Sequence, residues 1–245
     1  MRARQRHVNA RHAGAVLVLD ARYINQSDST AVSTWSDRSG NAYDFSQATG
    51  ANQPLFRTSG NGGSPAVQFD GTNDKLTRAD TGFPQGAITY IAVSIQSTAL
   101  AFQEYRSTFG YGVAAGGQAI WIGYGEDGNW GTEAFGTSQY GNGVGISNAT
   151  QAYIVASYTR STGNTYALWL NGGTKTTKPI GTNTQIYGAN GAAVGANGLG
   201  PTNAGYPAYL NGYIGTIIYA GSEWSDSLRR KFESSLAYSW KITCS

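Results

Sequence analysis

The sequence predicts an all-β fold, in which two antiparallel sheets form a sandwich with one short C-terminal helix. Three observations lead to this prediction. The stretch Tyr153–Lys178 contains two apolar runs with the residue period of two that strands require. The chain has 34 Gly, 16 Tyr and 6 Trp but only 13% charged residues, which is typical of short aromatic strands joined by tight turns. Near the C-terminus, Leu228, Phe232 and Leu236 recur at helical spacing.

The chain length is compatible with a single sandwich domain. A chain of 245 residues with 40% hydrophobic residues can bury a sizeable core. We expect one domain over residues 14–245, preceded by a basic arm over residues 1–13. The single cysteine, Cys244, excludes an internal disulfide and leaves the redox compartment open.

The arm carries much of the positive charge of the protein, whose net charge is +3. Its arginines are Arg2, Arg4, Arg6 and Arg11. Such an arm can dock on an acidic partner or nucleic acid, or it can simply solubilise the terminus. The apolar run that follows, Ala13–Leu19, is too short for a signal peptide and ends at Asp20, so we interpret Ala15–Leu19 as the first strand. No run reaches the ~20 apolar residues of a membrane-spanning helix, and no membrane insertion is expected.

Turn chemistry organises the region from Asp20 to Leu76. Trp35 is a large anchor beside a turn in which Asp37 can accept bonds from its own downstream backbone and Gly40 can take a positive φ. Val67 and Phe69 alternate inward before Asp70-Gly71 turns the chain.

The remaining strands are expected on both sides of two glycine-rich segments. The apolar run Ile88–Ile95 predicts a strand covered on both faces, and Ala119–Tyr124 continues the pattern. The stretch Tyr153–Lys178 predicts a β-meander at the centre of a sheet, with its turn at Asn171-Gly172. Residues 125–143 and 187–209 predict long loops, because they are rich in glycine and amide residues.

The C-terminal segment predicts a helix that starts at Ser225. Ser225 suits the N-cap, and Asp226 is favourable in the first turn. The apolar stripe that follows predicts packing, and we expect the helix to seal one edge or end of the sandwich.

Four motifs in this order resemble one known family. They are Leu-Asp-Ala at residues 19–21, Trp-x-Asp-x-Ser-Gly-Asn at residues 35–41, Pro-x-Val-x-Phe-Asp-Gly at residues 65–71 and Leu-Asn-Gly at residues 170–172. With the strand at Tyr209–Tyr219 and the helix behind it, the chain resembles the laminin G-like and pentraxin-like branch of the concanavalin A-like jelly rolls. The resemblance implies a jelly-roll sandwich whose members usually bind glycans or proteins and only sometimes hydrolyse sugars.

The sequence does not favour catalysis. Sugar hydrolysis needs two carboxylates that face one bond, and the glucanase motif Glu-x-Asp-x-x-Glu of this superfamily is absent. Glu126 and Glu133 are the nearest pair, but both lie in turn-like sequence. The two histidines, His7 and His12, lie in the arm, so no Ser/His/Asp triad is expected. We predict no catalytic residue.

Two acidic turns could hold a metal ion. Asp70, Asn73 and Asp74 form one, and residues 126–129 form the other. Calcium accepts clustered oxygen ligands of this kind. The alternative, which we favour, is that these side chains bond their own backbone and stabilise the turns. No cofactor is expected, and calcium is the cation that such turns would accept.

A glycan site needs flat apolar rings for the sugar faces and polar groups for the hydroxyls. The ligand-binding candidates share this chemistry and are Trp121, Tyr124, Asn129, Trp130, Glu133, Tyr140, Tyr206 and Tyr209, supported by Phe135, Gln139 and Asn203. The alternative is that the aromatic residues belong to the core or to subunit contacts. Trp130, between glycine and asparagine, is expected in a loop.

Three functions remain open at this point. The first is a non-enzymatic lectin-like recognition or display module that binds a glycan or protein surface. The second is a virus or phage structural protein, such as a capsid decoration or fibre component. In that case the basic arm would dock the protein on an acidic surface of the particle. The third is a secreted polysaccharide-degrading enzyme. The first two place the protein on a virion surface or outside the cell, as an oligomer or bound to an assembly.

Overall fold

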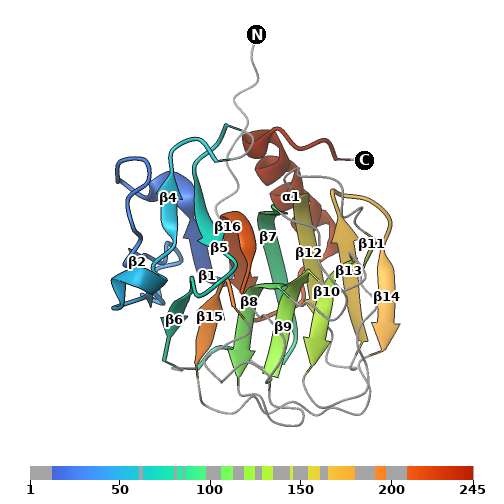
Figure 1. Ribbon diagram of the computed structural model, residues 1–245. Coiled ribbons are helices and arrows are strands. Elements are labelled where there is room, and N and C mark those ends of the chain that lie inside the picture. The colour runs from blue at the N-terminus through green and yellow to red at the C-terminus, as the bar shows by residue number, and fades with distance from the viewer. Residues whose placement is uncertain are drawn as a thin grey trace.

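The computed structural model describes residues 13–60, 63–79, 82–84, 86–97, 106–112, 119–124, 129–134, 144–145, 154–160, 165–179, 191–196 and 209–244. These residues form two eight-stranded antiparallel sheets and one α-helix (Figure 1). The predicted all-β sandwich with one C-terminal helix is confirmed. The basic arm lies outside the described residues, and the prediction of a single domain over residues 14–245 stays a prediction.

Sheet A has the strand order β14-β13-β12-β7-β16-β5-β4, and β1 also pairs with β16. Its strands are β1 (Ala15–Asp20), β4 (Leu55–Arg57), β5 (Ala66–Asp70), β7 (Ile88–Gln96), β12 (Ile154–Arg160), β13 (Thr165–Leu170), β14 (Thr176–Pro179) and β16 (Asn211–Ala220). The half of β16 that begins at Thr216 pairs with β1, and the half that ends at Ile214 pairs with β5.

Sheet B has the order β11-β10-β9-β8-β15-β6-β3-β2. Its strands are β2 (Thr34–Trp35), β3 (Phe45–Ser46), β6 (Leu76–Arg78), β8 (Arg106–Gly112), β9 (Ala119–Tyr124), β10 (Asn129–Ala134), β11 (Val144–Gly145) and β15 (Ala192–Val194). The short 3-10 helices η2 (Ala21–Tyr23) and η3 (Gly50–Asn52) follow β1 and β3.

The three-stranded meander is confirmed in its strands but not in its place. Asn171 and Gly172 make the turn with φ of 49° and 72°, and Tyr166 and Leu168 enter the core. However, β12, β13 and β14 lie at one side of sheet A, whereas β7 and β16 occupy its middle. The middle position follows from burial, because the long apolar strands β7 and β16 are covered on both faces.

Two strands lie inside the segments that were expected to be loops. Strand β10 falls in the first glycine-rich segment, and β15 falls in the second. Both pair with neighbours in sheet B: β10 with β9, and β15 with β8 and β6. Hydrogen bonding and burial in the sheet therefore outweigh the weak strand propensity of these residues.

Aromatic rings fill the space between the sheets. The ring of Phe109 in β8 lies 5.8 Å from that of Tyr90 in β7 and 5.6 Å from that of Tyr219 in β16, measured between centroids. Phe83 adds a ring 6.0 Å from Phe109, and Phe45 adds one at 6.3 Å. These contacts join both sheets into one core. As predicted, Val67 and Phe69 also point into it.

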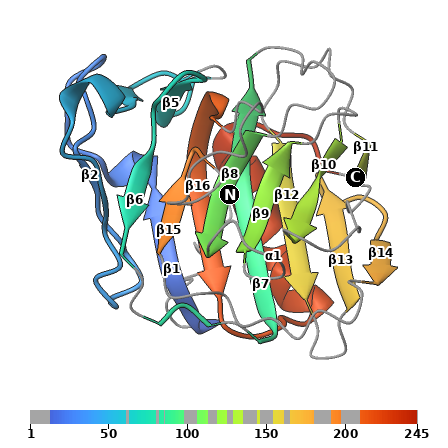
Figure 2. The same ribbon diagram turned by 60° about the horizontal axis from the view of Figure 1, so that its bottom comes forward.

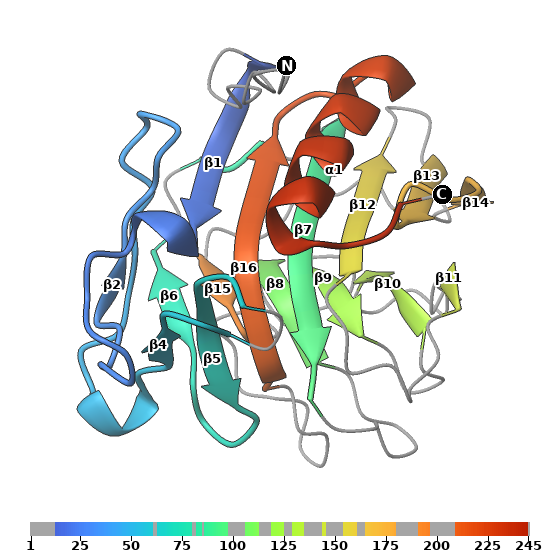
Figure 3. The same ribbon diagram turned by 90° about the horizontal axis from the view of Figure 1, so that it is seen from above.

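Helix α1 (Asp226–Trp240) lies across the outer face of sheet A (Figure 3). The Ser225 side chain caps it by accepting a bond from the N–H of Leu228, as predicted. The apolar stripe packs against β7, so the helix covers a face of the sheet and not its edge or end. The reason is that the outward residues of β7, such as Ile91 and Val93, are also apolar and need a cover.

Trp240 docks the end of α1 onto the middle of the sheet. Its indole lies over Gly215, at the irregularity in the pairing of β16 with β7. A Cβ at position 215 would lie 2.5 Å from Cε2 and Nε1 of the indole. Only glycine leaves room for the ring there.

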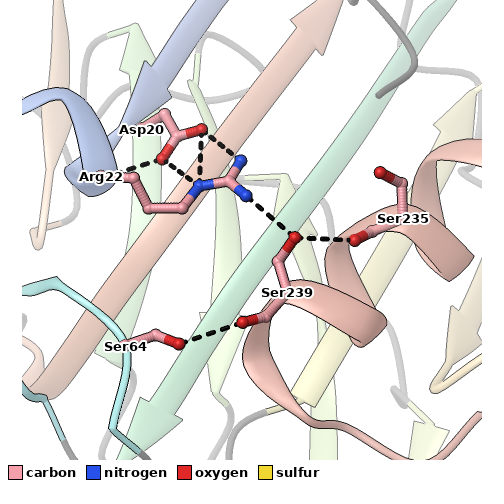
Figure 4. Close-up of polar contacts among 5 residues, drawn as sticks. All are labelled: Asp20, Arg22, Ser64, Ser235 and Ser239. Atoms are coloured by element: carbon pink, nitrogen blue, oxygen red, sulfur yellow. Dashed lines mark hydrogen bonds and ion pairs between the residues drawn. The ribbon is translucent and has the colours of Figure 1, made fainter. Parts of the chain in front are cut away.

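A polar tether fixes the same end of the helix (Figure 4). The Arg22 guanidinium bonds the buried Asp20 carboxylate, with Nε to Oδ1 at 2.9 Å. It also donates from Nη1 to the Ser239 hydroxyl at 2.9 Å and stacks on the Trp240 ring at 4.6 Å. The Ser64 hydroxyl donates to the Ser239 carbonyl at 3.0 Å. Strand β1, the start of β5 and the helix are thereby joined.

A buried ion pair lies beneath the first turns of α1. Arg229 and Glu233 are paired one helical turn apart, and both are almost completely buried. The Arg229 guanidinium also lies 3.7 Å from the centroid of the Trp169 ring in β13. The pair attaches the helix to the outer side of the meander.

Within the described residues, no helix is long and apolar enough to cross a membrane.

We expect Gly215→Ala to destabilise the protein by about 1–3 kcal/mol, because the new methyl group displaces Trp240 from the sheet. The free energy of unfolding in urea is the measurement. Gly86→Ala is the matched control, since a Cβ there meets nothing within 4 Å. Equal effects of the two changes would contradict this packing.

Arg229→Met is expected to cost about 3 kcal/mol or more, since it leaves the Glu233 carboxylate buried without its partner. The double change Arg229→Met with Glu233→Leu should recover most of the loss, because no buried charge is left. Urea unfolding of the single and double variants decides this. A double variant as unstable as the single one would show that the cost lies elsewhere.

Candidate functional site

The two outer faces of the sandwich are covered differently. Helix α1 lies on sheet A, whereas no helix of the described part of the chain lies on sheet B (Figure 2). The candidate site is therefore sought on the outer face of sheet B.

A row of paired residues crosses this face. Thr77 in β6 pairs with Ala193 in β15, which pairs with Gly110 in β8. Gly110 pairs with Trp121 in β9, and Trp121 pairs with Glu133 in β10. Directly opposite residues of antiparallel strands share a face, so the register brings an indole next to the position of a carboxylate.

Trp121 is the one large aromatic side chain in this row. Its neighbours along β9, Ile120 and Ile122, belong to the core, but Trp121 belongs to neither hydrophobic cluster. It keeps 8% of its surface exposed, so the indole is recessed in the face. Gly110 in β8 is its paired residue, and at Gly123, two residues along β9, a Cβ would lie 2.4 Å from the Arg106 carbonyl oxygen, so the backbone there is closely packed.

Tyr124 and Trp130, two of the expected ligand-binding residues, lie in the core. Trp130 is fully buried in β10, not in a loop, and its ring stacks on Tyr90 with centroids 6.4 Å apart. The Tyr124 hydroxyl shares a 2.9 Å hydrogen bond with Ser94, and burial raises its pKa. Strand alternation explains the result, because both residues occupy inward positions that pair with each other. Neither ring can reach a ligand.

The other candidates are only partly described. Asn129 begins β10, and Tyr209 is half-buried with the Lys75 ammonium 5.9 Å from its ring centroid. Tyr209 lies before β16 and is not in the row. The remaining positions lie outside the described residues: Tyr140, Tyr206, Phe135, Gln139, Asn203, Glu126, Asp127 and the arm residues Arg2, Arg4, Arg6 and Arg11. Their roles stay predictions.

The acidic turn at Asp70 serves the backbone. One Asp70 carboxylate oxygen accepts from the N–H groups of Thr72 and Asn73 at 2.8 and 3.2 Å. The Asp74 carboxylate accepts from the N–H of Asp70 at 3.0 Å. These are the turn-stabilising bonds that the sequence favoured over a calcium site. Among the described residues, no group of three or more His, Cys, Asp or Glu side chains could hold a metal ion.

Sequence reasoning missed one exposed group. The Arg38 guanidinium lies over the ring of Tyr23, 4.6 Å from its centroid. The residues around Asp37 predict a turn. Nothing in the sequence links Arg38 to Tyr23, which lies in η2, because only the tertiary fold brings the turn against η2.

Comparison with known proteins identifies the fold but no family. No family model matches the chain, and no curated protein matches it. Many solved structures are similar, and together with the observed topology they define the class as a jelly-roll-like β-sandwich.

Three of these similar structures illustrate how much of each chain is matched and at what identity. Domain 4 of AbnA, an extracellular arabinanase from Geobacillus stearothermophilus, is 13% identical with a TM-score of 0.59, over 85% of this chain and 99% of that one. The ligand binding domain of botulinum neurotoxin serotype D is 13% identical with a TM-score of 0.54, over 94% of this chain and 52% of that one. The Trypanosoma rangeli sialidase is 15% identical with a TM-score of 0.53, over 92% of this chain and 33% of that one.

The chain therefore spans about half of the neurotoxin domain and a third of the sialidase. At these identities the likeness shows the fold alone.

The stability of the protein should depend on pH through Asp74 in the acidic turn. Burial, followed by the nearby Asp70 carboxylate, raises the pKa of Asp74 to about 6. Between its ordinary pKa of about 4 and this value, the folded chain holds a proton that the unfolded chain has lost. The contribution of Asp74 to stability thus falls as pH rises from about 4 to about 6.

We expect Asp74→Asn to remove this dependence, so that the variant gains stability relative to the native chain between about pH 4 and pH 7. Urea unfolding at both pH values measures it. Asp28→Asn is a control whose stability difference should change little over this range, because bonds from the Thr58 N–H and the Ser29 hydroxyl lower the pKa of Asp28 and its titration lies below about pH 4. A constant difference between Asp74→Asn and the native chain would refute the prediction.

Proposed function

We propose that this chain is a non-enzymatic carbohydrate-binding module and that the outer face of sheet B around Trp121 is its binding face. The observation that carries the proposal is the position of Trp121. It is an aromatic residue on the one sheet face without a covering helix among the described elements, and it lies outside both hydrophobic clusters. An aromatic ring on the outward side of a strand can supply the flat apolar surface that a sugar site needs.

The chemistry of the row suits a sugar. A pyranose or furanose ring presents C–H groups on its faces and hydroxyls at its edge. An indole offers a flat apolar surface on which the C–H groups can pack. A carboxylate accepts hydrogen bonds from the hydroxyls. The register pairs Glu133 with Trp121 on neighbouring strands, which makes Glu133 the candidate acceptor.

Proteins of similar fold support a carbohydrate partner. Domain 4 of AbnA was solved in complex with arabinotriose, and the neurotoxin domain in complex with N-acetylneuraminic acid. The sialidase was solved as a covalent intermediate with 2,3-difluorosialic acid, so proteins of this similarity include an enzyme. The fold is therefore compatible with glycan recognition with or without cleavage.

We further propose binding without turnover, in the manner of the laminin G-like and pentraxin-like branch that the motifs resemble. The support is the sequence, which lacks the superfamily's glucanase motif. Display on a virion or cell surface, with capsid or other subunits as partners, stays a prediction. No observation on the described residues favours it over a free module.

Trp121→Ala is expected to weaken glycan binding about tenfold or more, because the ring supplies the apolar contact with the sugar face. A glycan array identifies the ligands of the native chain, and calorimetry with the strongest of them measures the loss. The same incubation with polysaccharide should release no new reducing ends.

The matched control is Tyr238→Ala, which removes an aromatic ring of 73% exposure from helix α1. It should leave the affinity unchanged. Thermal unfolding of each variant separates lost binding from lost folding. Unchanged affinity in a folded Trp121→Ala variant, or no bound glycan on the array, would remove the proposal. New reducing ends that Glu133→Gln abolishes would establish an enzyme instead.

A further inference from the structure

The turn between β2 and β3, residues 36–44, is fixed by the Asp37 carboxylate. Its Oδ1 accepts from the N–H of Val18 at 2.9 Å and from the N–H of Ser39 at 2.8 Å. Its Oδ2 accepts from the Ser39 hydroxyl at 2.6 Å and from the N–H of Tyr43 at 3.1 Å. Four bonds from three residues hold one carboxylate, so this turn has a defined conformation without a ligand.

The far end of the turn is held in a conformation that L residues rarely adopt. Ala42 has a φ of 57°, which costs about 1–2 kcal/mol for a residue with a side chain. Arg78 offsets this cost, because its Nη1 donates to the Ala42 carbonyl at 3.2 Å and its guanidinium stacks on Tyr43 at 4.5 Å. Strain that the surroundings maintain is characteristic of segments that present a functional group.

The group that this turn presents is Arg38. Its backbone N–H is bound to the Val18 carbonyl at 2.8 Å, and its guanidinium lies 4.6 Å from the centroid of the Tyr23 ring. Tyr23 is 62% exposed, and Arg38 is exposed as well. Tyr23 and Tyr238 are the two exposed large hydrophobic side chains of the described residues.

The guanidinium of Arg38 has no hydrogen-bond acceptor among the described residues. The contrast with Arg22 is direct, since that guanidinium is used by Asp20 and Ser239. The nearest carboxylate in sequence, that of Asp37, is already used by the turn. A stacked guanidinium keeps its planar fork of N–H donors free at the edge, which matches a carboxylate in bidentate geometry.

We propose that Arg38 and Tyr23 form a binding subsite for a carboxylate-bearing sugar. The sugar carboxylate lies in the plane of the Arg38 fork, and the sugar ring lies against the exposed part of Tyr23. The fixed turn lowers the entropic cost of binding, because Arg38 is already ordered on the ring. This inference rests on the proposed carbohydrate-binding function, and it adds the charge of the ligand and a second site separate from Trp121.

The test compares two pairs of probes that differ in the carboxylate. One pair is trigalacturonic acid and its methyl ester, and the other is sialyllactose and lactose. Calorimetry with the native chain should give at least about tenfold tighter binding of the acidic member in one pair or both. Arg38→Gln should reduce the ratio of the affinities for the acidic and the neutral probe to about one. Arg38→Lys should keep only part of it, because lysine retains the charge but not the fork.

Tyr23→Ala should weaken the acidic probe about fivefold or more, whereas Tyr23→Phe should not. Arg230→Gln is the matched control, since it removes one exposed positive charge from helix α1. A ratio near one for both pairs in the native chain overturns the proposal. So does an equal loss in Arg230→Gln and Arg38→Gln, which would reflect net charge alone.

Two further outcomes separate this inference from the proposed function. If Trp121→Ala abolishes binding of the neutral probes while Arg38→Gln has no effect on any probe, the carbohydrate module stands and the subsite fails. If a glutamate-rich peptide binds in an Arg38-dependent manner and neither acidic sugar binds, the partner is a protein, and the inference of a sugar is wrong.

Discussion

The packing of aromatic rings between the two sheets is the interaction on which the rest of the structure depends. Phe109 from sheet B lies among Tyr90 and Tyr219 from sheet A and the rings of Phe45 and Phe83. Burial of one such ring contributes about 1.5–3 kcal/mol. Because the inner faces of both sheets are used in this core, only the outer faces and the turns are left for recognition.

The two outer faces of the sandwich differ in what covers them. Helix α1 covers the outer face of sheet A and is held there by Trp240 over Gly215, by the Arg22 tether and by the buried pair of Arg229 and Glu233. Sheet B has no such cover among the described elements. This asymmetry assigns the stabilising role to the outer face of sheet A and makes the outer face of sheet B the candidate for recognition.

Arginine lies on an aromatic ring at four places in the described residues, and its surroundings decide its role; Arg78 on Tyr43 donates to the Ala42 carbonyl and holds the turn. Arg229 on Trp169 is buried and ion-paired, and Arg22 on Trp240 is half-buried and bonded to Asp20. Both therefore stabilise the helix dock. Arg38 on Tyr23 has the same stacking geometry but is exposed and lacks an acceptor among the described residues. An arginine stacked on an aromatic ring stabilises the fold when a carboxylate compensates the guanidinium charge. Without such a carboxylate, the guanidinium can bind a ligand.

Period and turn chemistry in the sequence determined the sandwich class, the turns at Asp37 and Asn171 and the capped C-terminal helix, because these depend on neighbours a few residues away. The tertiary structure alone decided that the meander lies to one side, that α1 covers a face, and that Trp130 points between the sheets while Trp121 points to the outer side of sheet B. Strand order and the choice of the inward face depend on contacts between residues far apart in sequence. A local pattern gives the alternation of a strand but not which of its two sides meets the other sheet.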